Sequence, residues 1–161
     1  MAAPVNPSSN QHISASFWKT EITDRWTDVY SGWATYTPTW TAATSNPSLG
    51  NGTITAAYKR LDGSKSVYLR LRLLAGSTTT YGNGAWSFSL PPGLTPTAFQ
   101  SLGGFLLDNS SVNRWAVSAW LTAAGGIERI ALNGTVGITG TAPFTWAVSD
   151  HLMLGGVYEI A

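Results

Sequence analysis

Two hydrophobic periods divide the chain. Between residues 14 and 35 the apolar side chains recur at spacings of four, four, three and four, which is the period of one face of an α-helix. From residue 36 onwards apolar and polar residues alternate, which is the period of a β-strand with one buried face. The pattern therefore predicts one amphipathic helix at 14–35 and one mainly β domain at 36–161.

The predicted helix has an aromatic face. Its apolar positions are Trp18, Ile22, Trp26, Val29 and Trp33. Ser14 or Ser16 can cap the N-terminus, because a serine hydroxyl accepts a hydrogen bond from a free N–H of the first turn. Three tryptophans on one stripe are more than a lone helix can bury, so the face must pack on another surface. Either its own β domain or other copies of the chain can supply that surface, and the segment before the helix favours the copies.

That preceding segment, residues 1–13, is predicted to be an extended arm. Pro4 and Pro7 lack a backbone N–H, and the serines and asparagine that follow them favour turns. The arm also has too few apolar residues to fold by itself. It is either a frayed terminus or a peg that orders against a neighbouring subunit, and in the second case Pro4, Val5 and Pro7 are its anchoring residues.

The β region contains seven or eight short segments of strand character. The clearest is 67–74, in which valine and leucine alternate with tyrosine and arginine. Asp62-Gly63 predicts a hairpin turn before that strand, and Pro91 ends the strand at 85–90. This spacing of strands and turns predicts a single antiparallel β-sandwich of jelly-roll type.

Composition removes several classes of function. Only 11% of the residues are charged, the formal net charge is +1, and there is no cysteine. The charge balance does not favour nucleic acid as a partner, and the lack of cysteine excludes disulfides and thiolate metal sites. No apolar run approaches the roughly 20 residues that span a membrane, so we expect no membrane insertion. Without a recognisable signal peptide, we expect the chain to stay in the cytoplasm until it assembles.

Catalytic residues are few. The two histidines, His12 and His151, lie in the predicted arm and at the start of the last strand. Glycoside hydrolysis needs two facing carboxylates, for which the pairs Glu128 with Glu159 and Asp108 with Asp150 can be named, but their sequence context singles out neither pair. We therefore expect a protein that is not an enzyme and that uses neither a cofactor nor a metal.

Aromatic side chains remain as the main chemical resource. A pyranose ring has an apolar face, so exposed aromatic rings beside polar groups are candidate glycan-binding surfaces. Tyr81, in the loop at 76–84, and Trp86, just after it, are the candidates here. Trp115 and Trp120 are five residues apart within one predicted strand, so they must point to opposite faces. One of these two is expected in the core and the other at the surface or in an interface.

Two stretches carry a resemblance to known proteins. The segment from Ile13 to Arg25, ISASFWKTEITDR, resembles a short segment common in phage tail-fibre and other virion proteins, although Lys19 stands where asparagine is usual. A longer run is similar to β-rich domains in tail, fibre and decoration proteins of phages that infect actinobacteria. That run comprises residues 36–42, 46–53, 76–82 and 86–91.

The resemblance implies a non-enzymatic bacteriophage structural protein on the virion exterior. It implies a homotrimer whose other partners are the major capsid or tail proteins of the particle, and it supplies neither catalytic residues nor a cofactor. A capsid decoration or head-fibre protein anchored through its arm and helix is the favoured form. A minor tail protein that adheres to a glycan on the host surface is the alternative.

Overall fold

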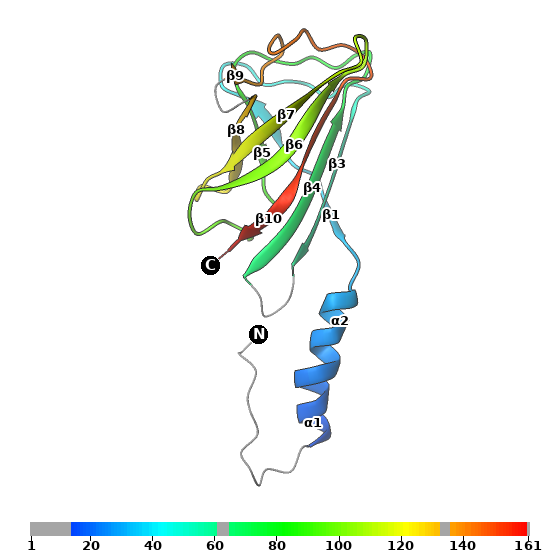
Figure 1. Ribbon diagram of the computed structural model, residues 1–161, viewed down its shortest axis with the longest axis vertical. Coiled ribbons are helices and arrows are strands. Elements are labelled where there is room, and N and C mark those ends of the chain that lie inside the picture. The colour runs from blue at the N-terminus through cyan, green and yellow to red at the C-terminus, as the bar shows by residue number, and fades with distance from the viewer. Residues whose placement is uncertain (1–13, 61–64, 133–135, 161) are drawn as a thin grey trace.

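The computed structural model describes residues 14–60, 65–132 and 136–160. A β domain forms one end of the molecule, and a helix projects from it (Figure 1). The strand pairs are antiparallel, so the mainly β, antiparallel class predicted from the sequence is confirmed. The predicted arm at 1–13 and the predicted Asp62-Gly63 turn lie outside the described residues.

The helix consists of three consecutive segments, α1 (Ala15–Trp18), a π-helical segment (Lys19–Asp24) and α2 (Arg25–Tyr30). Ser14 caps it, because the Ser14 hydroxyl oxygen accepts a hydrogen bond from the Phe17 N–H at 3.2 Å. The helix ends at Tyr30, earlier than the predicted limit at residue 35. The physical reason is that residues Ala34–Tyr36 form strand β1, which pairs with β3. These residues are therefore extended and cannot continue the helix.

An ion pair between residues five positions apart spans the π-helical segment. The Lys19 Nζ atom lies 2.9 Å from Asp24 Oδ1, across five residues. A π-helix joins residue i to residue i+5, so it brings together two side chains that an α-helix would separate. The segment contains neither proline nor glycine, and its residue types therefore did not predict the wider turn.

Ten strands within the described residues form one sheet. After β1 they are β2 (Trp40–Ala42), β3 (Thr53–Arg60), β4 (Ser66–Leu74), β5 (Trp86–Ser89), β6 (Gln100–Asp108), β7 (Asn113–Leu121), β8 (Gly126–Leu132), β9 (Val136–Gly137) and β10 (His151–Glu159). Their order across the sheet is β1-β3-β4-β10-β6-β7-β8-β5-β2, and β9 pairs with β8. The last strand in sequence, β10, therefore lies in the middle of the sheet.

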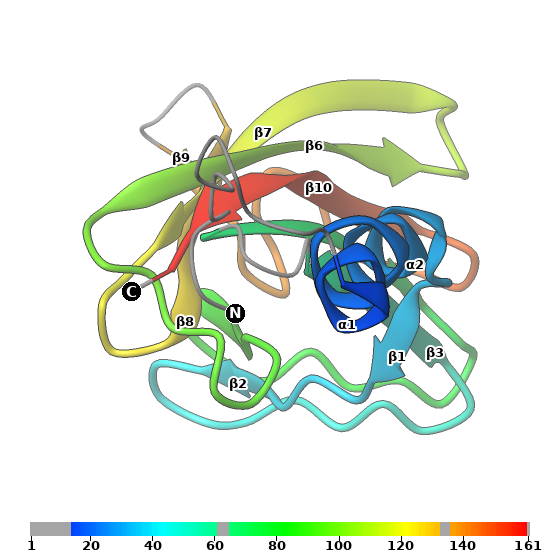
Figure 2. The same ribbon diagram turned by 90° about the horizontal axis from the view of Figure 1, so that it is seen from below.

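The sheet curls into an open half-barrel (Figure 2). Its β3-β4-β10 part and its β5-β8 part contribute side chains to one shared hydrophobic core. The predicted sandwich, which would have two separate sheets, and the predicted jelly-roll order are not confirmed. Period-two alternation shows only that one face of a strand is buried, and a curled single sheet satisfies that condition as well as two packed sheets do.

The core follows the alternation of the strands. In β4 every second residue from Val67 to Leu73 is buried, while Arg70 and Arg72 on the other face are exposed. Trp86 and Phe88 of β5 enter the same core from the other part of the sheet. Burial of each such large apolar side chain contributes about 1.5–3 kcal/mol to folding, so this layer supplies much of the stability of the domain.

Candidate functional site

The main candidate surface is the apolar face of the helix. We call Trp18, Ile22, Trp26, Val29 and Trp33 the helix ridge. The first four lie on the helix, whereas Trp33 follows its end at Tyr30, so the prediction that Trp33 belongs to the helical stripe is wrong. All five side chains are between 40% and 54% exposed, although they are large and hydrophobic. The helix projects beyond the β domain, so that domain leaves the lower part of the helix uncovered (Figure 1). Of the two surfaces that could cover the ridge, its own β domain therefore leaves Trp18, Ile22 and Trp26 exposed.

Tyr30 enlarges the helix ridge beyond the residues that the sequence analysis named. It is 77% exposed, and its ring stacks on that of Trp26 with centroids 5.7 Å apart. The spacing of four residues from Trp26 is the signal that could have identified it. Ile22, Trp26 and Tyr30 also line a shallow surface hollow of about 580 Å³ together with three hydroxyl residues of the helix and its C-terminal end.

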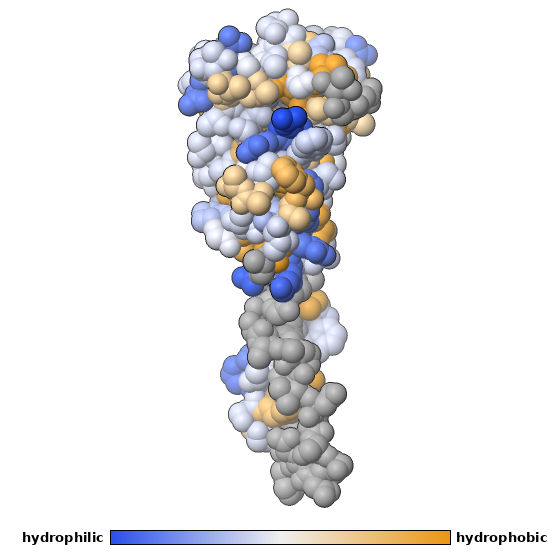
Figure 3. Space-filling model, turned by 90° about the vertical axis from the view of Figure 1, so that its left-hand side faces the viewer, coloured by the Kyte–Doolittle hydropathy of each residue, from blue (hydrophilic) through white to orange (hydrophobic). Residues whose placement is uncertain are grey.

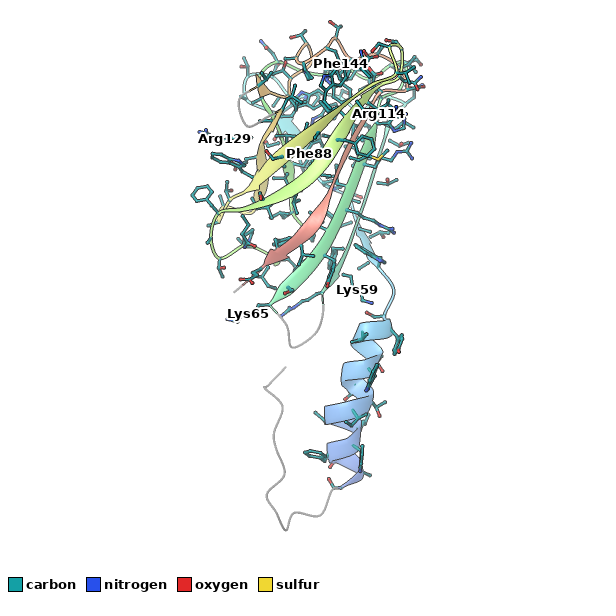
Figure 4. The ribbon with its side chains drawn as sticks, viewed as in Figure 1. Lys59, Lys65, Phe88, Arg114, Arg129 and Phe144 are labelled. Atoms are coloured by element: carbon teal, nitrogen blue, oxygen red, sulfur yellow. The ribbon has the colours of Figure 1, made fainter. Side chains whose placement is uncertain are left out.

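Two contacts connect the end of the helix to the β domain. The Arg70 guanidinium lies over the Trp33 ring, 4.6 Å from its centroid, which is a cation–π geometry. The Lys59 ammonium donates a hydrogen bond to the Val29 carbonyl at 2.5 Å, near the C-terminus of the helix. Lys59 lies beside the end of the helix in Figure 4. These contacts hold the root of the helix against β3 and β4 and leave Trp18, Ile22 and Trp26 free to meet another surface.

The candidate glycan-binding residues lie in a different environment from the one that the hypothesis required. Trp86 is only 1% exposed, and its indole N–H donates to the Tyr81 carbonyl at 3.0 Å. Tyr81 is half-buried and stacks on Trp86, and Trp146 packs against both rings. The alternation of Trp86 and Phe88 with Ser87 was the signal that Trp86 belongs to the core. The structure therefore presents no exposed aromatic face at Trp86.

Trp115 and Trp120 do point to opposite faces of β7, as their spacing predicts. Trp115 is half-buried and stacks on Phe144, with ring centroids 5.1 Å apart. Trp120 is 43% exposed and meets Phe99 in an edge-to-face contact. The exposed aromatic pair of the β domain is therefore Phe99 with Trp120. No sequence signal identified Phe99, which precedes β6 and belongs to no strand.

The acids considered for catalysis have local structural roles where hydrogen bonds are seen. Asp108 accepts hydrogen bonds from the side chains and backbones of Ser110 and Ser111, and the Ser110 hydroxyl contributes most to lowering the Asp108 pKa. Asp150 is fully buried and accepts the N–H groups of Asn109 and Ala147 at 2.8 and 2.6 Å. Both carboxylates thus hold loops at the same end of the domain.

His151 lies against the side chain of Arg72. Arg72 approaches the His151 Nδ1 atom with Nε at 3.2 Å and Nη2 at 3.1 Å. Partial burial and the positive charge of Arg72 lower the His151 pKa, and the nearby Asp150 charge opposes them. Within the described ranges no cluster of metal-ligating residues is found, and His12 lies outside them. The described helix is also too short and too polar to cross a membrane.

Comparison with known proteins gives a partial likeness. The chain is 30% identical over 116 residues to the Mu-like prophage FluMu defective tail fiber protein of Haemophilus influenzae. The aligned residues are 71% of this chain but only 18% of that protein. No family model matches the sequence, and no solved structure matches it.

The likeness agrees with the coarser part of the resemblance found in the sequence. It supports a bacteriophage tail or tail-fibre relationship, and with it a structural protein associated with the virion exterior. The narrower similarity to proteins of phages that infect actinobacteria is not confirmed. Because the chain corresponds to less than a fifth of the relative, the role of the whole tail fiber protein does not transfer to it directly.

Proposed function

We propose that this chain is a non-enzymatic structural component of the virion exterior, a trimer in which the helix joins subunits and the arm anchors them to the particle. The single observation that carries the proposal is the uncovered helix ridge. The similarity to part of a prophage tail fiber protein supports the tail as the location. Its partners are further copies of the chain and the tail or capsid proteins of the particle.

The shape of the ridge supports self-association of the helix. Trp18, Ile22 and Trp26 are exposed on the helix, which projects from the β domain (Figure 1). Three copies that pack one stripe around a common axis form a closed arrangement, which buries every ridge and leaves no open surface for further growth.

The composition of the ridge also favours association in water. Large hydrophobic side chains that are about half exposed gain roughly 25 cal/mol for each Å² of apolar surface that a partner covers. Charged residues occupy other positions of the same helix, among them Lys19 and Asp24, which form an ion pair with each other. The helix therefore has an apolar face that a partner can cover and a polar face that can remain in solvent.

Light scattering coupled to size exclusion tests the trimer on the full chain. We expect the wild-type mass to be three times 17.1 kDa and the double variant Trp18→Ala/Trp26→Ala to be monomeric. Trp120→Ala is the matched control, because it removes an exposed tryptophan of the β domain and should leave the trimer intact. A wild-type monomer at working concentration would overturn the trimer proposal.

Anchoring through the arm needs a separate test. Virions assembled with a chain lacking residues 1–13 should carry the wild-type complement of other proteins but little of this one, while the truncated chain remains a trimer in solution. The substitution of Pro4, Val5 and Pro7 by glycine and serine should have the same effect if these residues are the peg. Full incorporation of the truncated chain would show that the arm has no anchoring role.

A second candidate function is adhesion to a host-surface glycan, in the manner of a receptor-binding module. One observation favours it: the aromatic pair Phe99 and Trp120 remains exposed on the β domain, away from the helix ridge. Binding of the purified chain to host cell envelopes tests this function. In the Trp18→Ala/Trp26→Ala variant, each β domain should still bind the envelope with its own affinity. Only the avidity gained by linking three domains in a trimer should be lost.

A further inference from the structure

Phe99 and Trp120 border two adjoining surface hollows of the β domain. The Phe99 ring is 75% exposed, and its centroid lies 6.5 Å from that of Trp120. One hollow, of about 350 Å³, is completed by Gln100 and Ser101. The other, of about 470 Å³, is completed by Glu128, Arg129 and the turn that precedes β8. Both fall within the roughly 300–1,000 Å³ that small-molecule sites occupy.

A β-bulge places two charged side chains beside this aromatic pair. Between β7 and β8, Trp120 pairs with Glu128 and Ser118 pairs with Ala131, so two residues of β8 lie opposite one residue of β7. Arg129, in the bulge, has a φ of 45°, which a side-chain-bearing residue rarely adopts. Glu128 and Arg129 therefore both lie on the outer face, while their flanking isoleucines are buried. A regular strand would have turned one of the two into the core.

Each of the two charged side chains contacts another residue that lines the second hollow. The Arg129 guanidinium lies over one face of the Trp120 ring, 5.4 Å from its centroid. Glu128 Oε1 accepts a hydrogen bond from the Thr122 hydroxyl at 3.2 Å, which leaves its second carboxylate oxygen for a ligand. Arg129 lies at the left-hand edge of the domain in Figure 4, and Figure 3 views that side, where hydrophobic and hydrophilic residues adjoin.

We infer that this outer-face site binds an uncharged pyranose sugar. The apolar face of a pyranose ring can stack on Phe99, whose ring is the most exposed aromatic surface of the site. Neighbouring hydroxyls of the sugar can then donate to the Glu128 carboxylate and accept from the Arg129 guanidinium. A neutral diol can donate to Glu128 and accept from Arg129 at the same time. A sugar carboxylate cannot donate to Glu128, and a sugar ammonium cannot accept from Arg129, so either charged group satisfies only one of the two side chains.

This inference rests on the second candidate function, adhesion to a glycan, and specifies its site and its class of sugar. It does not depend on the trimer, because Phe99, Trp120, Glu128 and Arg129 belong to one subunit and lie outside the helix ridge. It also replaces Trp86, which the core encloses, with an aromatic pair that a ligand can reach.

Saturation-transfer NMR on the full chain tests the inference. The probes are the methyl pyranosides of glucose, galactose and mannose, with glucuronic acid and glucosamine as charged comparisons. We expect millimolar binding of at least one neutral glycoside and weaker binding of both charged sugars. Absence of binding by all three neutral glycosides would overturn the inference, as would equal or tighter binding of a charged sugar.

Three variants locate the binding. Phe99→Ala should weaken the neutral glycoside at least about tenfold. Arg129→Asn should do the same while it keeps the backbone, because asparagine tolerates a positive φ. Phe105→Ala is the matched control, because Phe105 is also exposed on the outer face but lines neither hollow. Loss of binding in the control as well, or its retention in Phe99→Ala, would place the sugar elsewhere and overturn the inference.

The same variants separate this inference from the adhesion function on which it rests. If the chain adheres to host envelopes and Phe99→Ala does not alter that adhesion, the function holds and the site is wrong. If neither the wild-type chain nor the variants adhere, the function fails. If in that case a neutral sugar binds the wild-type chain but not the Phe99→Ala variant, the site is a sugar site that does not serve adhesion.

Discussion

The tryptophans of the β domain core and those of the helix show opposite uses of one residue type. Trp40, Trp86 and Trp146 are buried, and the Trp86 ring lies 4.8 Å, centroid to centroid, from each of the other two. Trp18 and Trp26 are more than half exposed on the helix. The curled sheet encloses its aromatic rings, whereas a single projecting helix has no second layer to place over its own. Aromatic residues therefore stabilise the fold of the β domain, whereas those of the helix remain exposed and can be covered by another molecule.

The difference also separates what one subunit needs from what the assembly needs. Loss of a buried ring should destabilise the single chain at any concentration. Loss of a ridge ring should act through association, and its effect on apparent stability should depend on protein concentration.

Trp86→Ala should lower the free energy of unfolding by about 3–5 kcal/mol, because it leaves a cavity among Trp40, Trp146 and Phe88. Urea denaturation measures the loss. Trp18→Ala, measured in protein dilute enough to be monomeric, should change that free energy by less than about 0.5 kcal/mol. Equal losses in the two variants would mean that the helix is part of the core of its own subunit.

Asp150 and Asp108 form a similar pair among the carboxylates. Asp150→Ala removes the acceptor of two backbone N–H groups in a fully buried position, at a cost of about 1–3 kcal/mol for each group left unpaired. Asp108→Ala should cost clearly less, because water can replace its exposed hydrogen bonds to Ser110 and Ser111. Thermal denaturation of both variants at pH 7 measures the difference, and a larger loss for Asp108→Ala would contradict it.

Two adjacent glycines in β6 extend the comparison to the backbone. A Cβ atom on Gly104 would lie 2.0 Å from the Met153 carbonyl oxygen of β10, whereas a Cβ on Gly103 would meet open space. Gly104→Ala should therefore destabilise the domain by about 1–3 kcal/mol. Gly103→Ala should stay within about 0.5 kcal/mol of wild type. Urea midpoints of the two variants measure the contrast, which equal losses would refute.

The smallest expected effect is a pH dependence at His151. Its pKa is lower in the folded chain than the ordinary 6.5, so the unfolded chain binds more protons as the pH falls. This contribution to stability is complete above about pH 6.5 and is lost as the pH falls towards the pKa of the folded state. The melting temperature of wild type should fall more between pH 7.5 and 5.5 than that of His151→Gln. Parallel curves would show that burial and the charge of Arg72 do not lower the His151 pKa.

The sequence predicted those features that depend on local periodicity. The alternation in 67–74 identified β4 and its buried face, and the four-four-three spacing from Trp18 to Val29 identified the helix and its exposed face. The last step of that spacing, to Trp33, reached beyond the end of the helix at Tyr30. Trp86 was misjudged as a candidate glycan-binding residue because its place beside a polar loop outweighed its alternation with Phe88. A polar loop next to a residue in the sequence does not show whether the curled sheet buries that residue.

Features that depend on pairing between distant segments could not be predicted. The single curled sheet follows from β2 pairing with β5 and β10 entering between β4 and β6, and no local pattern encodes either. The bulge at Arg129 is an exception, because the sequence contains a signal for it. The buried Ile127 and Ile130 are three residues apart, whereas residues on one face of a regular strand are two apart. Phe99 became a candidate only when its loop was seen beside Trp120, a residue of a different strand.

The central position of β10 also determines when the domain can close during synthesis. Within the described residues, the β1-β3-β4 group and the β6-β7-β8-β5-β2 group share no hydrogen-bonded strand pair with each other, and β10 is the strand that joins them. Both groups are complete in the nascent chain before residues 151–159 leave the ribosome. Until then β4 and β6 are unpaired edge strands on the side that β10 will occupy. During this interval either edge can pair with a strand of a neighbouring chain, which is a route to aggregation.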